Sequence, residues 1–144
     1  MIEDVIYSRL SGDADIIAYT STRIYPWTDV PQNPTYPYIV FMRVGSDPIE
    51  SLSGSSGLCY ARIQIDVFNK GTTTAYRTAK LIAEEVRKSL QGFSGTVASI
   101  DVGGIRCLSD ADDAALGPEH GQERGIARVM SEFMVGFHQA IPTF

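Results

Sequence analysis

Apolar and polar side chains alternate along residues 59–68, and this alternation predicts a β-strand with one buried face. One face carries Ala61, Ile63, Ile65 and Val67, and the other carries Arg62, Gln64 and Asp66. A polar face opposite an apolar one is typical of an antiparallel sheet that is covered on one side. Residues 126–138 alternate in the same way and predict the closing strand. Its second face is half apolar, because it includes Met130 and Met134.

Apolar residues recur at helical spacing in two parts of the chain. The first part predicts a short helix that ends at Gly12, with the apolar positions Ile2, Val5, Ile6 and Leu10. Asp13 is placed to cap a second short helical turn. Residues 74–90 predict a long amphipathic helix, whose stripe consists of Tyr76, Ala79, Ile82, Ala83, Val86 and Leu90. We expect this helix to cover the apolar face of the sheet.

The remaining segments predict further strands and two long loops. Prolines between residues 26 and 37 favour an irregular surface segment, with at most a short edge strand at Arg23–Tyr25. Residues 38–44 and 97–107 predict strands, and Gly103-Gly104 indicates a bulge or bend in the second of them. The segments Ser46–Gly57 and Asp110–Gly125 are polar and predict loops.

These elements together predict an α+β fold. We expect a mostly antiparallel sheet of four to five strands, with the long helix and the short N-terminal helices packed on one face. The chain has 144 residues, of which 44% are hydrophobic, and this is enough to bury one core. We therefore expect residues 1–144 to form a single domain.

The charge balance limits the classes of partner. The formal net charge is −5, and an acidic domain repels the phosphate backbone, so we expect no sequence-specific binding of nucleic acid. No stretch of 18 apolar residues is present, and the first residues lack the basic and apolar regions of a secretory signal. We expect no membrane partner. Cys59 and Cys107 are interpreted as small buried hydrophobic residues. A disulfide is the alternative, although nothing else in the sequence indicates an oxidising compartment. No Cys-x-x-Cys motif is present, so a zinc ribbon or redox motif is not expected.

Candidate chemistry is sparse along the chain. Asp110, Asp112 and Asp113 form a carboxylate cluster that could hold a hard cation, but the EF-hand pattern is absent and a solvated acidic loop is the preferred interpretation. His120 and His138 are far apart and lack neighbouring ligands at zinc-site spacing. We therefore expect no catalytic, cofactor-binding or metal-binding residue, and no enzymatic activity.

Two surfaces remain as candidates for contact with other proteins. One is the half-apolar face of the closing strand, with Met130 and Met134. The other is the Ser46–Gly57 segment, which we expect to be mobile in the free protein and ordered at a partner. An idle flexible loop is the alternative. The candidate contact residues of the Ser46–Gly57 segment are Asp47, Pro48, Ile49 and Glu50. The segment has no Lys or Arg, so a protein partner is favoured over DNA. An aromatic patch at Tyr25 and Trp27 is a further candidate, but packing over the edge of the core is the preferred interpretation.

Three short segments in a fixed order carry a family resemblance. They are Arg23-Ile24-Tyr25-Pro26, Pro37-Tyr38-Ile39-Val40-Phe41 and Ile63-Gln64-Ile65-Asp66-Val67-Phe68, and one helix follows the last of them. With the two N-terminal helices and the two closing strands, this order resembles the tail-completion and tail-terminator proteins of long-tailed bacteriophages. The resemblance extends over nearly the whole chain.

The resemblance implies a structural protein with no catalytic residues or cofactor. It implies a homohexameric ring at the end of the tail tube, which terminates tube growth and joins the tail to the head connector. The implied partners are other copies of the chain, the tail tube protein and the head–tail connector protein. The implied location is the virion tail of a phage or prophage particle that is assembled in the bacterial host cytoplasm.

Two other classes of function stay open at the level of the sequence. One is a small-molecule-binding or regulatory domain of ferredoxin-like α+β type, which would need a closed pocket with convergent polar groups. The other is a metal-dependent enzyme that uses the segment around Asp110. A ring in solution would favour the tail protein, whereas a monomer or dimer stabilised by a ligand would favour the other two classes.

Overall fold

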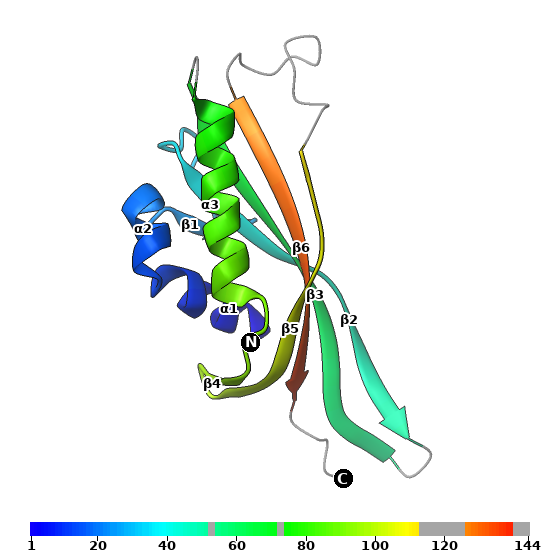
Figure 1. Ribbon diagram of the computed structural model, residues 1–144. Helices are drawn as coiled ribbons and strands as arrows, with labels where there is room; N and C mark the ends of the chain where they lie inside the picture. Colours follow the sequence, from blue (N-terminus) through cyan, green and yellow to red (C-terminus); the bar gives the residue numbers. More distant parts are fainter. Residues whose placement is uncertain (52–53, 72–73, 113–125, 140–144) are drawn as a thin grey trace.

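The protein is described by a computed structural model that covers residues 1–51, 54–71, 74–112 and 126–139. These residues form three helices and a six-stranded sheet (Figure 1). The helices are α1 (Ile2–Ser11), α2 (Ala14–Thr20) and α3 (Ala75–Leu90). The strands are β1 (Ile24–Pro26), β2 (Tyr38–Ser51), β3 (Gly54–Lys70), β4 (Gly95–Val97), β5 (Ile100–Asp112) and β6 (Ile126–His138). The predicted α+β class is confirmed, although the sheet has six strands instead of four to five.

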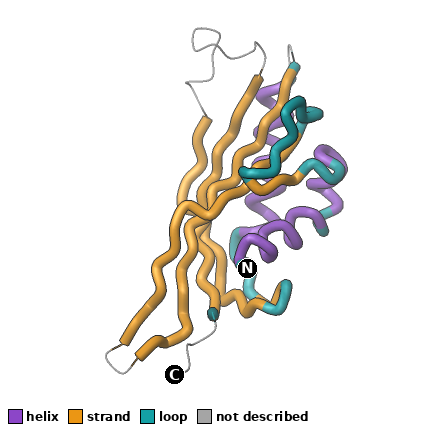
Figure 2. The backbone as a smooth tube through the Cα atoms, turned by 180° about the vertical axis from the view of Figure 1, so that it is seen from behind, coloured by secondary structure: helices purple, strands orange, loops and turns teal. Residues whose placement is uncertain are grey.

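The strands lie in the order β1-β2-β3-β6-β5-β4. The short strand β1 runs parallel to β2, and the other neighbours are antiparallel. All three helices lie on one side of the sheet, as Figures 1 and 2 show from opposite directions. The other side, which we call the open face, carries no helix of the described chain.

The core lies between the helices and the centre of the sheet, as the alternation and the helical stripe predict. Val86 of α3 and Ile65 of β3 are fully buried, and Phe133 of β6 is buried beside them. α1 is tied to α3 by a hydrogen bond of 2.7 Å, in which the Arg9 guanidinium donates to the carbonyl oxygen of Ser89. Burial of apolar area is the main favourable contribution to folding, so the apolar side of each amphipathic element faces the core. The predicted positions of the long helix and the sheet relative to one another are therefore confirmed.

Residues 97–107 are wrongly predicted as one strand, because a tight turn divides this segment into β4 and the start of β5. Val97 pairs with Ile100 across the two residues Ala98 and Ser99. These two residues have φ angles of 51° and 64°. Two successive left-handed residues are typical of a type I′ hairpin turn, which usually contains Asn-Gly. The sequence Ala-Ser carries no such signal, and the turn could not be predicted from it.

Replacement of the turn residues by Ala98→Asn with Ser99→Gly is expected to raise the free energy of unfolding by about 1 kcal/mol, because both new residues tolerate the left-handed region better. Urea denaturation of the parent and the variant measures the difference. Ser94→Gly is a suitable control, since the backbone at Ser94 is not left-handed and extra chain freedom there should not stabilise the fold. An unchanged free energy of unfolding in the turn variant would show that the left-handed backbone at Ala98 and Ser99 does not destabilise the parent.

The prediction of a loop over Ser46–Gly57 is wrong, because β2 and β3 continue through this segment as a paired hairpin. Asp47 pairs with Tyr60, Pro48 with Cys59, and Ser51 with Gly54. We call residues 46–51 and 54–57 the β2–β3 arm, and it projects beyond the helices at one end of the sheet (Figure 1). Backbone pairing holds the arm, and polar side chains do not prevent such pairing. Pro48 is accommodated because it lies beside a register shift.

The prediction of a loop over Asp110–Gly125 is also wrong for its first three residues. β5 continues to Asp112, which pairs with Val129 of β6. The rest of that predicted loop, residues 113–125, lies outside the described residues, as do Asp113 and His120. The bulge predicted at Gly103-Gly104 is confirmed by a register shift between Val102 and Gly104.

Candidate functional site: an assembly surface

The open face is built from the outward-facing side chains of four adjacent strands. The cross-strand register shows which residues share this face with Arg62 and Met134, which are directly opposite one another. They are Tyr38, Val40 and Met42 of β2; Tyr60, Gln64, Asp66 and Phe68 of β3; Arg128, Met130 and Glu132 of β6; and Arg106 of β5. Most of these side chains are only partly covered by their neighbours. The face is therefore a mixed apolar and charged surface.

Two ion pairs across β3 and β6 cross the middle of the open face. The Arg128 guanidinium lies 2.9 Å from a carboxylate oxygen of Asp66, and Gln64 donates to the same carboxylate at 3.1 Å. The Arg62 Nε donates to Glu132 at 2.7 Å. The Asp66 side chain is only 9% exposed, so its charge is satisfied by these neighbours, and it is not presented to a partner. These pairs help to set the register of the two strands.

An aromatic cluster covers the end of the open face away from the arm. The rings of Tyr38 and Phe68 are stacked with centroids 5.0 Å apart, and Tyr25 and Tyr36 lie against Tyr38. Burial raises the pKa of Tyr38 to about 12, and Tyr36 adds to this effect. Tyr38 is therefore neutral at physiological pH and serves packing. The expectation that Trp27 packs over the core edge is wrong, because its side chain is 61% exposed.

A hollow of about 690 Å³ lies on the open face next to the base of the arm. Its lining residues come from β3, β5 and β6: Leu58, Tyr60, Gly103, Gly104, Ile105, Arg106, Met134 and Gly136. Met134 is thus part of the hollow. Met130 lies on the same face but four residues along β6, about 13 Å away. Asp47 is directly opposite Tyr60, so the arm begins at the rim of the hollow.

The sequence-predicted contact residues are therefore only partly brought together. Asp47, Pro48 and Ile49 lie on the arm and are exposed, and Glu50 pairs through its backbone with Ser55. Tyr60 and Arg106 are not among the contact residues predicted from the sequence, and Gly103-Gly104 is predicted there only as a bulge or bend. Their shared position depends on the strand order, and the signal in the sequence is the pair of adjacent glycines within a predicted strand.

Asp112, in the segment predicted as an acidic loop, has structural partners on α3. Asp112 lies 3.1 Å from the Lys80 ammonium and accepts a hydrogen bond from the Tyr76 hydroxyl. The hydrogen bond from Tyr76 lowers the pKa of Asp112 below its usual range, and the hydrogen bond from Lys80 adds to this effect. Asp110 lines a smaller hollow with Lys80 and Arg87. Within the described residues, no group of three or more His, Cys, Asp or Glu side chains could hold a metal ion.

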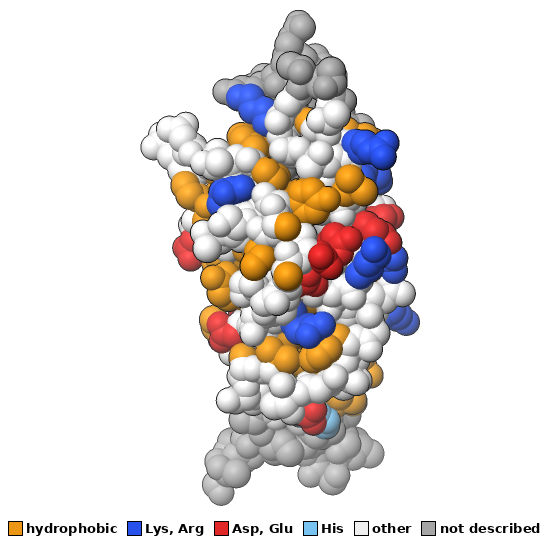
Figure 3. All heavy atoms as spheres, turned by 60° about the vertical axis from the view of Figure 1, so that its left-hand side comes forward, with side chains coloured by type: hydrophobic (Ala, Val, Ile, Leu, Met, Phe, Trp, Pro, Cys, Tyr) orange, Lys and Arg blue, Asp and Glu red, His pale blue; other side chains and the backbone are white. Residues whose placement is uncertain are grey.

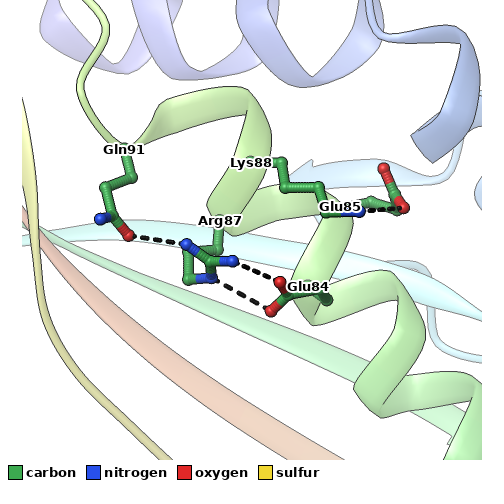
Figure 4. Close-up of polar contacts among 5 residues, drawn as sticks. All are labelled: Glu84, Glu85, Arg87, Lys88 and Gln91. Carbon is green, nitrogen blue, oxygen red and sulfur yellow. Dashed lines mark hydrogen bonds and ion pairs between the residues drawn. The ribbon is translucent and has the colours of Figure 1, made fainter.

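The outer side of α3 is a solvated surface of local ion pairs (Figure 4). Arg87 donates to Glu84 and to Gln91, in each case with a contact of 3.0 Å, and Lys88 lies 3.4 Å from Glu85. The hydrogen bond from Arg87 lowers the pKa of Glu84. Figure 3, which views the helix-bearing side, shows acidic and basic groups side by side with small scattered apolar patches. Such local pairs support a helix surface modestly.

Both cysteines of the chain lie among the described residues. Cys59 is buried and Cys107 half-buried, and both are free thiols. Burial raises the pKa of Cys107, which keeps this thiol protonated. His138 is exposed at the end of β6. Among the described residues, no helix is long and apolar enough to cross a bilayer.

The family assignment follows from a comparison with models of protein families. Residues 4–122 match the model of the family described as tail completion protein gp17. The chain belongs to the tail completion protein gp17 family. This is a structural family and not an enzymatic one, so the predicted resemblance and the expected lack of enzymatic activity are both confirmed.

Solved structures share the fold of this chain. One is a chain of a structure titled "Virion of native gene transfer agent (GTA) particle", with a TM-score of 0.74 and 18% sequence identity, over 93% of this chain and 92% of that chain. A second solved chain has a TM-score of 0.57 and 15% identity, over 99% of this chain and 96% of that chain. None of the curated proteins compared with the chain matches it in sequence.

Proposed function

We propose that this tail completion protein forms a ring, with six copies of the chain, at the end of the tail tube of a phage or phage-like particle. There it terminates tube growth and joins the tail to the head connector. The observation that carries the proposal is the family match over residues 4–122. The shared fold with a chain of a gene transfer agent virion supports it.

The open face and the β2–β3 arm are suited to ring assembly because they are different surfaces of one subunit. A ring needs a heterologous contact, in which one patch of a subunit meets a different patch of the next. The open face carries half-buried methionines, a residue type enriched at interfaces, while the arm projects away from the helix layer (Figure 1). Each subunit therefore has two distinct candidates for the two sides of such a contact.

The proposed partners beyond the ring are the tail tube protein and the head–tail connector protein. The net charge of −5 and the absence of Lys and Arg from residues 46–57 favour protein partners over nucleic acid. The expectation for the arm is that it orders further at such a partner.

The proposed function is tested by deleting the gene from its phage or prophage and examining the particles by negative-stain electron microscopy. We expect tails of uncontrolled length and heads without tails, and rescue of both defects by the parent gene. Light scattering of the purified protein during size-exclusion chromatography measures the molar mass of the assembly, and therefore the number of copies in the ring. Normal particles in the deletion strain would contradict the proposal.

Met130→Glu combined with Met134→Glu is expected to weaken self-association about 30-fold or more, since two charges would have to be buried at an apolar contact worth about 2 kcal/mol or more. The monomer should stay folded, because both side chains lie outside the helix-covered core. Light scattering over a concentration series measures association, and circular dichroism measures folding. Leu81→Glu, at an exposed position of α3, is the control. An unchanged ring in the double variant would place the contact elsewhere.

A further inference from the structure

The hollow on the open face exists because its floor is made of glycine. Gly104 and Gly136 are directly opposite one another on β5 and β6, and neither contributes a side chain. A Cβ atom built on Gly104 would meet no atom within 4 Å, so the space above it is open. A Cβ on Gly136 would lie 3.1 Å from the Tyr60 ring, which therefore lies across that glycine and forms one wall.

Arg106 is the charged group of this hollow, and its guanidinium lacks a partner within the described chain. Arg62 and Arg128 on the same face each contact a carboxylate. Arg106 is exposed and makes no side-chain hydrogen bond or ion pair with the residues that the structure describes. An apolar hollow that includes Leu58 and Met134 and has one available guanidinium at its wall is suited to an extended apolar segment with a single carboxylate.

Residues 47–49 of the β2–β3 arm, Asp-Pro-Ile, have this chemistry. The side chain of Asp47 is exposed and makes no ion pair with any described residue, and the exposed residues Pro48 and Ile49 follow it. The strand pairs Asp47–Tyr60, Tyr60–Gly136 and Gly136–Gly104 place Asp47 in the same cross-strand row as the hollow, with two strands between them. Three inter-strand spacings amount to about 14 Å. Asp47 therefore cannot reach Arg106 of its own chain.

We propose that the hollow receives the β2–β3 arm of a second copy of this chain, with Asp47 of that copy paired with Arg106. The proposal rests on the ring assembly proposed above and names the contact that closes it. The arm and the hollow are different surfaces, so each subunit donates one arm and accepts another, as a heterologous ring requires. The open space above Gly104 allows the backbone of the incoming strand to approach the sheet closely there.

A charge-exchange experiment tests the pairing. Asp47→Lys and Arg106→Glu are each expected to lose the assembly, with at least a tenfold rise in the concentration at which it forms. An equimolar mixture of the two variants is expected to recover it, because arms from one variant match hollows of the other in an alternating ring. Analytical ultracentrifugation of each variant and of the mixture is the measurement. Arg77→Glu, an exposed change on α3, is the matched control and should assemble like the parent.

Filling the hollow gives a test that does not depend on charge. In Gly104→Leu the new Cβ meets no atom within 4 Å, so the monomer should stay folded while the longer side chain fills the hollow and blocks assembly. Gly104→Ala should have a smaller effect. A parent ring that survives Gly104→Leu and both charge variants would overturn the docking proposal and leave the ring standing. A parent that stays monomeric at every concentration would count against both. If Gly104→Leu loses tail joining but keeps the ring, the hollow binds a different protein, and this result would also overturn the proposal.

Discussion

Val86→Asp is expected to lower the free energy of unfolding by about 4 kcal/mol, because it places a carboxylate without a partner in the core. Val86 is 0% exposed. It lies in the buried cluster between α3 and the sheet, which includes Ile65 and Phe133. This is a large part of the stability of a domain of this size, since the free energy of unfolding is usually about 5–15 kcal/mol. Urea denaturation followed by circular dichroism measures the loss.

The matched control is Leu81→Asp, which makes the same kind of change on the solvent side of the same helix. Leu81 is 45% exposed, so this variant should lose only about 0.5 kcal/mol, mainly through helix propensity. Equal effects of the two variants would show that α3 does not pack on the sheet through Val86.

The damage caused by Val86→Asp should also depend on pH. Burial disfavours the charged form of the new carboxyl group and raises its pKa in the folded state above the unfolded value of about 3.9. The folded state therefore binds more protons than the unfolded state between these two values, and the variant loses stability as the pH rises through them. The difference from the parent should be smaller at pH 4 than at pH 7. A constant difference across this range would indicate that the new side chain reaches solvent.

Replacement of Ile49–Leu58 by Asn-Gly is expected to abolish tail joining while the fold persists. The two-residue turn would connect Pro48 to Cys59, which already face one another in the β2–β3 register. No described residue of the removed segment belongs to the buried core cluster, so the melting temperature should fall by only a few degrees. Function should be lost because the variant removes the end of the arm, with Ile49, and also removes Leu58 from the wall of the hollow.

Complementation of the gene deletion measures this effect, with electron microscopy of the particles and a count of infectious or gene-transferring units. The parent gene is the positive control, and the purified variant must show a cooperative melting transition. A folded variant that restores normal tails would support the alternative in which the segment is an idle extension. A variant that restores tails but no longer assembles in solution would show that the removed segment is needed for assembly in solution and not for tail joining.

The features that the sequence alone determined are those set by local periodicity. Alternation along β3 and β6 identified the buried face of each strand and placed Met130 and Met134 on the opposite face. The stripe that contains Val86 identified α3 and its buried side. These assignments are local because a period of 2 or of 3.6 residues, combined with burial of apolar area, decides them within one segment. Of the short segments that carry the family resemblance, Ile63–Phe68 lies in the well-patterned part of β3.

The remaining features were decided only by tertiary structure. Residues 46–51 and 54–57 lie in β2 and β3 because backbone pairs such as Asp47–Tyr60, Pro48–Cys59 and Ser51–Gly54 join the two sides of the hairpin, and backbone hydrogen bonds do not depend on polar or apolar side chains. The Ala98-Ser99 turn is formed by φ angles that its residue types rarely adopt. The hollow beside Arg106 depends on the order β3-β6-β5, which brings Tyr60, Gly136 and Gly104 into one row. Contacts between residues so far apart in the chain arise only when the strands assemble, and no local pattern specifies them.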